Sequence, residues 1–595
     1  MSADDLQFRD IDACFADFLC RLAGGRNDDL HRAAMHASAA VGAGHVCLHL
    51  DEAFGSNGAA LAATLRALPV VGPPGGRTPL ILDERSRLYL YRYWNYEYLV
   101  AEFIKQKSAK LRPVSLPLLR AGIDRIFGPK GDDAVDWQRV AAAAAVRSGF
   151  CVISGGPGTG KTSTVVSILA LLLEQAGEEG TGIALAAPTG KAAARLGDSI
   201  RDARQRLAAV TPVAERIPGQ VSTIHRLLGV IPGSVRFRHN RHNPLPHRVV
   251  VVDEASMVPL PLMARLMEAL APSARLILLG DRDQLASVEA GAVLGDICDT
   301  GRAHRFSAPF REFIRDAAGE EIEGEAGGEG NGQPGTPADS LVILRRNYRF
   351  GAASAIGAAS AAVNEGDGDR LMALVSGEGM DGGVALRPVP PAERLAGALA
   401  ESVVAGYGEY LRQTDPEQAL ICFDRFRVLG AVRQGEYGVQ GLNRAIERVL
   451  ARQGLIDADR VWYPGRPVMV TVNDYGLGLF NGDIGLVVAD PAFSGGLAVC
   501  FPAPGGGVRR LSPARLPAHE TVFAMTVHKS QGSEFDRILL VLPPFDSPVL
   551  TRELVYTGLT RARTGAVIWA DEEILRSAAA RRSERRSGLR EALWG

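Results

Sequence analysis

Residues 150–162 read FCVISGGPGTGKT, and the fold follows from this stretch. Its first five residues predict a buried strand, whereas helical periodicity begins after Thr162. The turn between them fits the pattern G-x-x-x-x-G-K-T with Gly155-Gly156-Pro157-Gly158-Thr159-Gly160-Lys161-Thr162. Glycines let backbone N–H groups close around phosphates, and the N-terminus of the next helix favours negative charge. The stretch therefore predicts a nucleoside triphosphate site, with Lys161 at the β- and γ-phosphates and Thr162 on Mg²⁺.

Two carboxylates follow a second apolar run, VVVV at 249–252. In this class of nucleotide site the first of them, Asp253, is expected to hold Mg²⁺ through water. Glu254 is then placed to polarise the attacking water. A helix N-cap is the alternative reading of the pair, and a Gly-rich turn with a chance lysine is the alternative for the loop. The chain holds only seven lysines, so a chance lysine there is improbable, and the two motifs together predict an NTPase.

Composition bounds the class of protein before any further motif is read. With 595 residues the chain predicts three or four domains. Its formal net charge of −1 excludes a histone-like basic protein, although a neutral total can still contain a basic groove. Seven widely spaced cysteines without a CxxC pair argue against a zinc site or a disulfide framework. The polar N-terminus MSADDLQFRD and the lack of a long apolar run predict a cytoplasmic protein.

The pattern of apolar and polar residues changes along the chain. Residues 1–115 predict a mainly helical domain, with an aromatic run near residues 89–98 that suits either its own core or a partner surface. Short apolar runs then alternate with helical stretches, which predicts parallel sheets covered on both faces. The runs taken as strands of these sheets are 150–154, 183–187, 249–252, 275–279, 419–423, 537–541 and 566–570.

Two segments interrupt this alternation. Residues 317–340 are acidic and Gly-rich, and they predict a disordered loop or linker. Residues 456–516 contain short strands at 468–472, 484–488 and 497–501 between Gly and Asn/Asp turns, which predicts an inserted β-barrel. Residues 576–590 contain six arginines, for which a solvated helix and a DNA or partner contact are both open.

Six further motifs occur in a fixed order along the chain. They are APTGKAAARL at 187–196, TIHRLLG at 223–229, GDRDQLASVE at 280–289, NYRF at 347–350, TVHKSQGSE at 526–534 and VYTGLTRA at 555–562. As an ordered set they resemble the superfamily 1 helicases, specifically the RecD-like branch, from about residue 136 to residue 570. The resemblance implies two RecA-like P-loop NTPase domains and an SH3-like β-barrel insert, so the fold class is α/β with a mainly helical N-terminal domain.

The resemblance also implies roles in ATP binding and hydrolysis. Gln138 matches the glutamine that reads adenine, and Gln284 matches a sensor of the γ-phosphate. Arg349 and Arg561 match two arginines that approach the γ-phosphate from the second RecA-like domain. A fixed cation at that position stabilises transition-state charge, so hydrolysis becomes conditional on closure of the two domains.

Eight residues match positions that line the single-stranded DNA track of this branch. Hydroxyl, amide, ammonium and imidazole groups suit contacts to phosphate and sugar without base selectivity. The matching residues are Thr189, Lys191, Thr223, His225, Asn473, Asn481, Thr526 and His528. Taken singly, each is equally typical of a surface or capping residue.

The N-terminal segments AGHVCL at 43–48 and 88–97 resemble the RecD subunits of bacterial exodeoxyribonuclease V. That family implies an ATP-driven 5′→3′ helicase that works beside RecB and RecC in repair of double-strand breaks, with the N-terminal domain docked on RecC. Duplex ends and single strands of DNA are the implied substrates. No nuclease constellation is apparent, so cleavage is expected from RecB. A free-standing RecD-like helicase and an ATP-gated DNA-binding regulatory subunit are the two alternatives.

These observations predict three parts of the chain. Residues 1–115 form a partner-docking domain. Residues 116–340 form the first RecA-like domain, which includes a small insert near 200–222 and the acidic linker at 317–340. Residues 341–595 form the second RecA-like domain with the β-barrel insert at 456–516.

Overall fold

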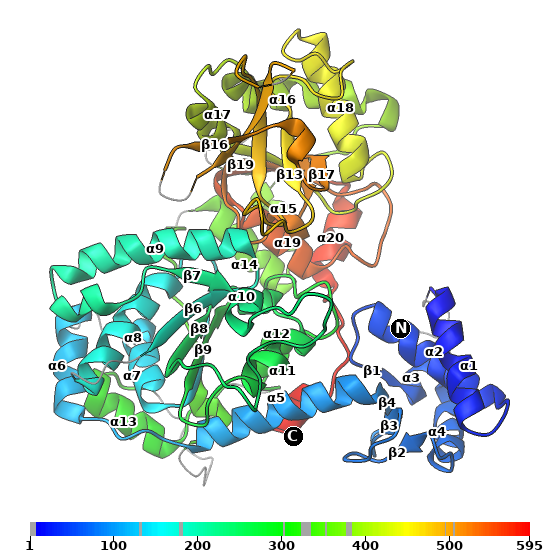
Figure 1. The fold of residues 1–595 in the computed structure, drawn as a ribbon, viewed down its shortest axis with the longest axis vertical. Coiled ribbons are helices and arrows are strands. Elements are labelled where there is room, and N and C mark those ends of the chain that lie inside the picture. The colour runs from blue at the N-terminus through cyan, green and yellow to red at the C-terminus, as the bar shows by residue number, and fades with distance from the viewer. Residues whose placement is uncertain are drawn as a thin grey trace.

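The fold was obtained as a computed structural model (Figure 1). It describes residues 7–129, 134–177, 182–301, 304–322, 335–351, 354–375, 383–493, 495–503 and 506–595. Two α/β units lie one above the other, and a smaller N-terminal unit lies beside the lower one (Figure 1). Within the described residues, no helix is both long enough and apolar enough to cross a membrane.

The first α/β unit is built on a sheet of six parallel strands in the order β10-β5-β9-β8-β6-β7. Its strands are β5 (Phe150–Ser154), β6 (Ile183–Ala187), β7 (Val221–Thr223), β8 (Val249–Val252), β9 (Arg275–Gly280) and β10 (Leu341–Ile343). The four strands predicted here are therefore confirmed. Because the strands are parallel, the motifs that follow β5, β6, β8 and β9 all meet at one edge of the sheet.

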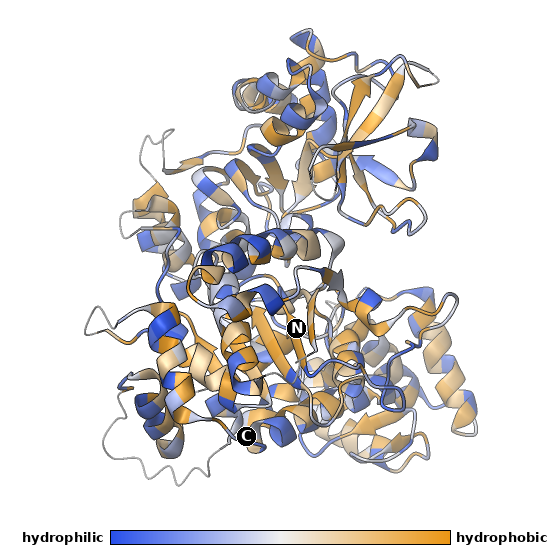
Figure 2. Cartoon of the chain, turned by 60° about the vertical axis from the view of Figure 1, so that its left-hand side comes forward, coloured by the Kyte–Doolittle hydropathy of each residue, from blue (hydrophilic) through white to orange (hydrophobic). Residues whose placement is uncertain are grey.

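Alternation of side chains along these strands explains why they read as continuous apolar runs. Val249 and Val251 belong to the core on one face of the sheet, whereas Val250 and Val252 belong to the core on the other. Helices cover both faces of the sheet. In Figure 2 the strands are hydrophobic (orange), and the helices around them carry both hydrophobic and hydrophilic (blue) residues. The covering helices are α5 (Tyr91–Ala109), α6 (Leu116–Phe127), α7 (Trp137–Arg147), α8 (Lys161–Ala176), α9 (Gly190–Ala208), α10 (Ile224–Leu228), α11 (Leu260–Glu268), α12 (Val293–Cys298) and α13 (Ala308–Ala318).

The second α/β unit contains five parallel strands in the order β11-β20-β19-β12-β18. They are β11 (Val384–Arg387), β12 (Phe426–Gly430), β18 (Ala524–Thr526), β19 (Phe535–Val541) and β20 (Ala562–Trp569). The helices of this unit are α14 (Ala355–Glu365), α15 (Gly368–Val375), α16 (Leu395–Leu411), α17 (Pro416–Phe423), α18 (Val439–Arg452), α19 (Arg552–Leu559) and α20 (Glu572–Ala580).

One predicted strand of this unit is wrong. Residues 419–423 lie in helix α17, and the strand is the following segment, β12. The helix begins at Pro416, whose fixed φ suits a first helical position, and Asp415 caps it by accepting hydrogen bonds from the backbone N–H groups of Glu417 and Gln418. These start signals outweigh the short apolar run that suggested a strand.

An antiparallel sheet is inserted between α18 and β18, in the order β16-β15-β14-β13-β17. Its strands are β13 (Pro467–Val470), β14 (Ile484–Ala489), β15 (Leu497–Pro502), β16 (Val508–Leu511) and β17 (His519–Thr521), so it extends past the expected end at residue 516. Val468, Val487 and Phe501 form its own small core, while Met469 and Leu486 face the core of the second unit. The described strands form an open series of five, and closure into an SH3-like barrel stays a prediction.

The N-terminal unit combines helices with a small sheet that the sequence analysis did not foresee. Its helices are α1 (Asp10–Leu22), α2 (Asp28–Gly42), α3 (Leu50–Phe54) and α4 (Gly58–Arg66). The sheet β1-β4-β3-β2 is made of β1 (Cys47–His49), β2 (Val71–Gly72), β3 (Leu80–Leu82) and β4 (Arg87–Leu90). The aromatic run divides between β4 and α5, and α5 continues along the first α/β unit (Figure 1).

The structure shifts three expected boundaries. Strand β10 at 341–343 pairs with β5, so the first unit extends beyond residue 340. Residues 200–222 are the end of α9, a 3₁₀ turn (Pro212–Arg216) and β7, all parts of the first unit rather than an insert. Of the expected linker at 317–340, residues 323–334 lie outside the described residues.

The Arg-rich segment at 576–590 is not one solvated helix, because α20 (Glu572–Ala580) ends at Ala580 and the next eight residues are not helical; the alternative of a DNA or partner contact stays a prediction. After α20, residues 581–594, which we name the C-terminal strap, cross from the second α/β unit to the junction between the N-terminal unit and the first α/β unit. The backbone carbonyl of Arg586 accepts a hydrogen bond from the backbone N–H of Val46 (2.7 Å), and the backbone N–H of Arg586 donates to His45 Nδ1 (3.1 Å). The strap ends in α21 (Leu589–Trp594), whose Leu589 and Leu593 are buried in a shared core.

Polar contacts hold the strap at both of its neighbours. Gly588 donates its backbone N–H to the buried carboxylate of Glu97 (2.8 Å). Ser587 donates its hydroxyl to Asp296 of α12 (2.7 Å), and Arg585 reaches the carbonyl of Ser287 (3.4 Å) in the first α/β unit. Burial raises the pKa of Glu97 to about 7, which is consistent with a carboxyl group enclosed by the strap.

Substitution Gly588→Ala is predicted to loosen the strap and to lower the free energy of unfolding by about 1–3 kcal/mol. A Cβ at this position would lie 2.5 Å from the Tyr89 hydroxyl and 2.6 Å from Glu97, both buried. Gly397→Ala is the matched control, because a Cβ there meets nothing within 4 Å in the exposed face of α16. Thermal unfolding of both variants checks the prediction, and an unchanged midpoint for Gly588→Ala would contradict it.

Candidate functional site

The glycine-rich loop connects β5 to α8 at the edge of the first sheet. Gly158 and Gly160 have φ of +83° and +80°, which side chains other than glycine rarely adopt. A Cβ on Gly158 would overlap Arg349, and one on Gly160 would overlap the Gln138 amide. The loop therefore needs glycine both for its backbone conformation and for the side chains that surround it, and its tight path leaves backbone N–H groups for phosphate.

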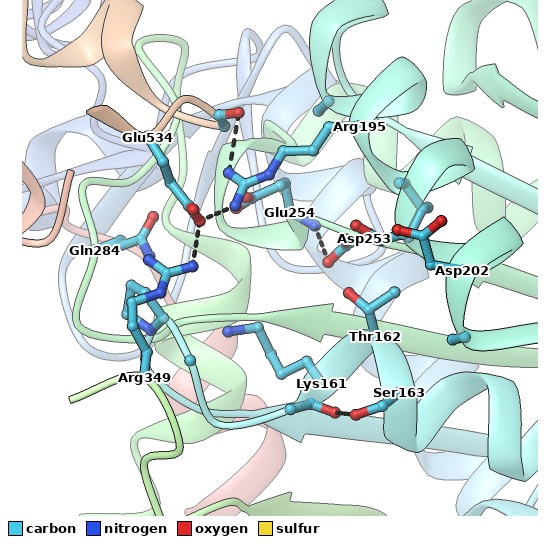
Figure 3. Close-up of a pocket in the computed structure, with 18 of the residues that line it drawn as sticks. Lys161, Thr162, Ser163, Arg195, Asp202, Asp253, Glu254, Gln284, Arg349 and Glu534 are labelled. Carbon is cyan, nitrogen blue, oxygen red and sulfur yellow. Dashed lines mark hydrogen bonds and ion pairs between the residues drawn. The ribbon is translucent and has the colours of Figure 1, made fainter. Parts of the chain in front are cut away.

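Lys161 and Thr162 open helix α8, facing the pocket shown in Figure 3. The Lys161 ammonium donates hydrogen bonds to the carbonyl groups of Gly155 and Gly156, the latter at 3.1 Å. These contacts hold the ammonium over the loop, where it faces the predicted positions of the β- and γ-phosphates. The hydroxyl of Thr162 lines the same pocket.

Asp253 and Glu254 lie at the end of β8, on the opposite wall of the pocket (Figure 3). The Asp253 carboxylate accepts a hydrogen bond from the backbone N–H of Glu254 (2.8 Å). Glu254 has φ of +52°, a strained conformation for a residue with a side chain, which is typical of functional sites. Burial, together with the nearby charge of Glu254, raises the pKa of Asp253, so a cation at this position would favour its charged form.

The donors present fit one magnesium ion bound together with a nucleotide. Mg²⁺ prefers hard oxygen ligands and is usually held by one or two protein groups plus substrate phosphates. Thr162 and Asp253 supply such oxygens on facing walls of the pocket. Across the residues that the structure describes, there is no cluster of three His, Cys, Asp or Glu side chains that would hold a metal by itself.

A buried carboxylate joins the two α/β units beside this pocket. Asp281 follows β9, and its side chain accepts hydrogen bonds from Gln284 (3.0 Å) and from the hydroxyl of Tyr556 (2.9 Å). Tyr556 lies on α19 of the second unit. Gln284 is thereby held at the seam between the units, where it lines the pocket.

Arg349 lies closer to the loop than its expected place in the second domain. It follows β10, on a segment whose Asn347 donates to the Pro157 carbonyl (2.9 Å) and whose Tyr348 donates to the Gly158 carbonyl (2.8 Å). The next residue, Phe350, is buried in the core of the second unit, so Arg349 lies where the chain passes from one unit to the other. The parallel pairing of β10 with β5 brings this segment onto the glycine-rich loop, and the approach of Arg349 to the γ-phosphate from the second unit stays a prediction.

Arg561 does come from the second α/β unit, as predicted. It follows α19, is only 2% exposed, and donates to the carbonyl groups of Thr557 (3.0 Å) and Ser533 (3.2 Å). Its guanidinium lines the same pocket as Lys161. The pocket is thus lined by cations from both units.

Two pocket residues, Arg195 and Glu534, were missed in the sequence analysis. Arg195 lies on α9 and forms an ion pair with Glu534, which also pairs with Arg349 (Figure 3). Both residues stand inside motifs that had been singled out, at 187–196 and 526–534. The available signal was their charge, because the other polar residues singled out in these two motifs were assigned to the DNA track.

Gln138 borders a second cavity next to the loop. Its side-chain amide donates to the Thr159 carbonyl (3.2 Å). The cavity is lined by Trp137, Arg345 and Tyr348, and Arg345 stacks its guanidinium on the Trp137 ring at 4.5 Å. Aromatic surfaces next to an amide suit a planar base, and the role of Gln138 in binding adenine stays a prediction.

Three of the predicted DNA-contact residues are threonines that cap turns. Thr189 accepts a hydrogen bond from the N–H of Ala192 at the start of α9, and Thr223 does so from Arg226 at the start of α10 (both 3.2 Å). Thr526 accepts from Lys529 in the same way (3.2 Å). A hydroxyl that accepts still has its own hydrogen to donate, so capping and phosphate contact are compatible.

The remaining predicted contacts divide between the first unit and the inserted sheet. Lys191 and His225 lie on α9 and α10, and burial lowers the pKa of both. His528 starts a 3₁₀ turn after β18. Asn473 and Asn481 lie in the hairpin between β13 and β14, where the Asn473 side chain accepts the N–H of Asn481 (2.8 Å). Phe480 of this hairpin packs over Gly190, so the hairpin reaches the first unit.

An exposed basic loop next to His225 was also missed. Residues 236–248 read RFRHNRHNPLPHR, and there is no Asp or Glu between Glu215 and Asp253. Phe237 of this loop contacts His225, with ring centroids 5.9 Å apart. Seven Arg and His residues in thirteen positions were the signal that could have found it. Such a loop suits a phosphate backbone.

Three family models match the chain. The model described as "RecBCD enzyme subunit RecD, N-terminal domain" matches residues 5–89. An "AAA domain" matches residues 138–290, and a "UvrD-like helicase C-terminal domain" matches residues 521–569.

Curated relatives match over most of the chain. The RecBCD enzyme subunit RecD of Mycobacterium tuberculosis is 41% identical over 592 residues, covering 97% of this chain and 94% of that protein. The subunit of the same name from Haemophilus influenzae is 37% identical over 84% of this chain and 79% of that protein. The ATP-dependent RecD2 DNA helicase of Deinococcus radiodurans is 32% identical over 73% of this chain, which spans 49% of that longer protein.

Solved structures give a weaker likeness. A Pif1 helicase from Bacteroides in complex with ADP-AlF3 and single-stranded DNA matches with a TM-score of 0.33 and 17% identity, over 71% of this chain and 90% of that one. These scores are too low to carry an argument about this chain.

Lys161→Gln is predicted to lower nucleotide hydrolysis at least about 100-fold, because a neutral amide cannot replace the ammonium at the developing phosphate charge. Phosphate release measured with single-stranded DNA present checks this, with unchanged thermal unfolding as evidence of an intact fold. Lys105→Gln, an exposed lysine of α5, is the matched control. Hydrolysis retained by Lys161→Gln would place the nucleotide site elsewhere.

Proposed function

This chain belongs to the RecD family of RecBCD enzyme subunits. We propose that ATP is hydrolysed in the pocket between its two α/β units, and that this hydrolysis drives 5′→3′ movement along single-stranded DNA. The chain is an ATP-dependent DNA helicase subunit that works with RecB and RecC, in the repair of double-strand breaks by homologous recombination. One observation carries the proposal. Lys161 of the first unit and Arg561 of the second line a single pocket.

Closure of that pocket would couple hydrolysis to movement. Lys161 binds the β- and γ-phosphates, Glu254 orients the attacking water, and Arg349 and Arg561 neutralise charge in the transition state. Thr162 and Asp253 would hold Mg²⁺, which draws charge from the phosphates when bound. Because Arg561 stands on the second unit, full catalysis requires the units to close, and each closure shifts one set of DNA contacts relative to the other.

The DNA track would run across the seam above this pocket. Thr189, Lys191 and His225 belong to the first unit, whereas Thr526 and His528 belong to the second. Asn473 and Asn481 are in the inserted hairpin that reaches Gly190. A translocating motor needs contacts from both units to one strand of DNA. Since bacterial DNA lies in the cytoplasm, the chain is expected to act there.

The outer face of α1 suits docking on RecC. Ile11, Phe18 and Leu22 are spaced seven and four residues apart and are 63%, 52% and 54% exposed. That spacing places them on one helical stripe, and α1 lies at the outer edge of the N-terminal unit, away from the motor (Figure 1). A large apolar stripe on an exposed helix is typical of an interface.

Two other readings of the chain make different predictions. A free-standing helicase would be active alone; the Deinococcus relative has the name of a helicase rather than of a subunit. An ATP-gated regulatory subunit would bind DNA and nucleotide without translocating. The apolar stripe on α1 favours the subunit over the free-standing enzyme, and the cations facing the pocket from both units favour a motor over a switch.

Direction is tested with duplexes that carry either a 5′ or a 3′ single-stranded tail. The chain is assembled with RecB and RecC, and strand separation that depends on Lys161 of this chain is expected from the 5′ tail alone. Arg561→Ala is expected to retain nucleotide binding and to lose turnover and unwinding, because only the transition-state cation is removed. Lys161-dependent unwinding from the 3′ tail would contradict the direction. Hydrolysis without unwinding in the assembly would favour the regulatory reading.

The α1 stripe is tested with the double substitution Ile11→Glu and Phe18→Glu. Affinity for RecC is expected to fall at least about 10-fold, because two carboxylates would enter an apolar interface. Hydrolysis by the isolated chain is expected to stay unchanged. Val461→Glu is the control, since Val461 is 76% exposed on the second unit. Equal loss of affinity in the control, or none in the double variant, would contradict docking through α1.

A further inference from the structure

Three arginines from three parts of the fold converge on the carboxylate of Glu534. Arg195 lies on α9, Arg349 on the segment after β10, and Arg563 on β20. Each forms an ion pair with Glu534, that of Arg563 at 3.2 Å. The Glu534 side chain is 8% exposed. The steps of hydrolysis proposed above assign no role to Glu534 or Arg195.

Glu534 and its partners stand in the wall of the nucleotide pocket. Glu534, Arg195 and Arg349 line the same pocket as Lys161, and Figure 3 shows the Glu534 carboxylate between the two guanidinium groups. The Arg349 side chain is 23% exposed, so its charge is only partly hydrated and a nearby anion stabilises it; within the part of the chain that the structure describes, Glu534 is the carboxylate that pairs with Arg349.

A γ-phosphate would compete with Glu534 for the same cations. Carboxylate and phosphate oxygens both match the planar, forked donors of arginine. One Nη atom of Arg349 is buried and has no hydrogen-bond partner in the described chain. That unused donor is available to a second anion, so Arg349 can begin to bind a phosphate before it leaves the carboxylate.

Glu534 also belongs to a segment that carries two predicted DNA contacts, Thr526 and His528. The segment is tied to the first unit at two points. Gln531 donates to the Leu285 carbonyl (2.7 Å), and Arg195 donates to the Gly532 carbonyl (3.2 Å). Within the segment, the backbone N–H of Gln531 donates to the His528 carbonyl (3.2 Å) and that of Ser533 donates to the Ser530 carbonyl (2.9 Å), so the segment is compact. DNA that shifts Thr526 and His528 would therefore also shift Glu534 relative to its arginines.

We propose that Glu534 is a positioning residue that links DNA occupancy to the ATP site. It holds Arg195 and Arg349 until DNA shifts it and the γ-phosphate replaces it, and Arg195 then becomes a third arginine in contact with the nucleotide. This inference rests on the proposed function, because it takes the ATP site and the DNA track as assigned above.

Glu534→Gln keeps the shape of the side chain and removes its charge. The arginines are then free for phosphate without DNA, so the KM for ATP is expected to fall about 3- to 10-fold. The ratio of kcat with and without single-stranded DNA is expected to fall at least about 5-fold towards one. Hydrolysis is measured on the full chain, alone and assembled with RecB and RecC, and the rate of the matching Lys161→Gln preparation is subtracted.

Asp536→Asn is the matched control. Asp536 lies two residues away and contacts Arg563 at 3.7 Å, but it does not line the nucleotide pocket. Its loss is expected to change neither the KM nor the DNA stimulation. The same changes in Asp536→Asn as in Glu534→Gln would overturn the proposal, since a general loss of charge would then explain both.

Arg195→Gln tests the same link from the other partner, at a side chain that is 38% exposed. Its KM for ATP is expected to rise several-fold, and an unchanged KM would remove Arg195 from the nucleotide. A Glu534→Gln variant whose kcat falls equally with and without DNA would show that Glu534 only maintains the fold. Failure of the proposed function is distinguishable, because the unsubstituted chain would then lack DNA-stimulated hydrolysis.

Discussion

The carboxylate of Asp281 is the contact on which the geometry of the motor depends. It is 1% exposed, and it accepts hydrogen bonds from Gln284 of its own unit and from Tyr556 of the other. A buried carboxylate without partners is strongly unfavourable, so both contacts are retained as long as the units stay together. These two hydrogen bonds join the units at the seam next to the nucleotide pocket. The pocket residues of the second unit, Arg561 among them, are positioned by that same seam.

The residues of the nucleotide site could be predicted from the sequence where they are close together along the chain. The glycine-rich loop and the pair at 253–254 sit directly after strands, so their position at the sheet edge follows from the parallel topology. Arg349 and Glu534 are 185 residues apart, and no local pattern connects them. The contact of the Arg349 segment with the glycine-rich loop could not be predicted either, because it follows from the return of β10 to the first sheet, a pairing that depends on where the chain folds back rather than on its local composition.

The fold was predictable where strands are long and buried on both faces. Strands β5, β6 and β8 have the expected bounds, because every residue in them is apolar or small. The sheet of the N-terminal unit was missed, since its strands have two to four residues and are too short to show alternation. Residues 419–423 misled in the opposite direction, because a run of five apolar residues suits a strand and a buried helix equally well until the Asp415 cap is considered.

The C-terminal strap sets an order of events during synthesis. Leu589 and Leu593 cover apolar surface that Val46 and Tyr89 share with the first α/β unit. The first α/β unit ends with β10 at residue 343, about 250 residues before Leu589, so at the usual 5–20 residues per second the ribosome takes roughly 12–50 s to add the intervening chain. For that time the junction remains uncovered although both flanking units have already emerged. The nascent chain thus exposes apolar surface until residues 581–594 emerge, and loss of these residues would leave a complete motor with an unsealed junction.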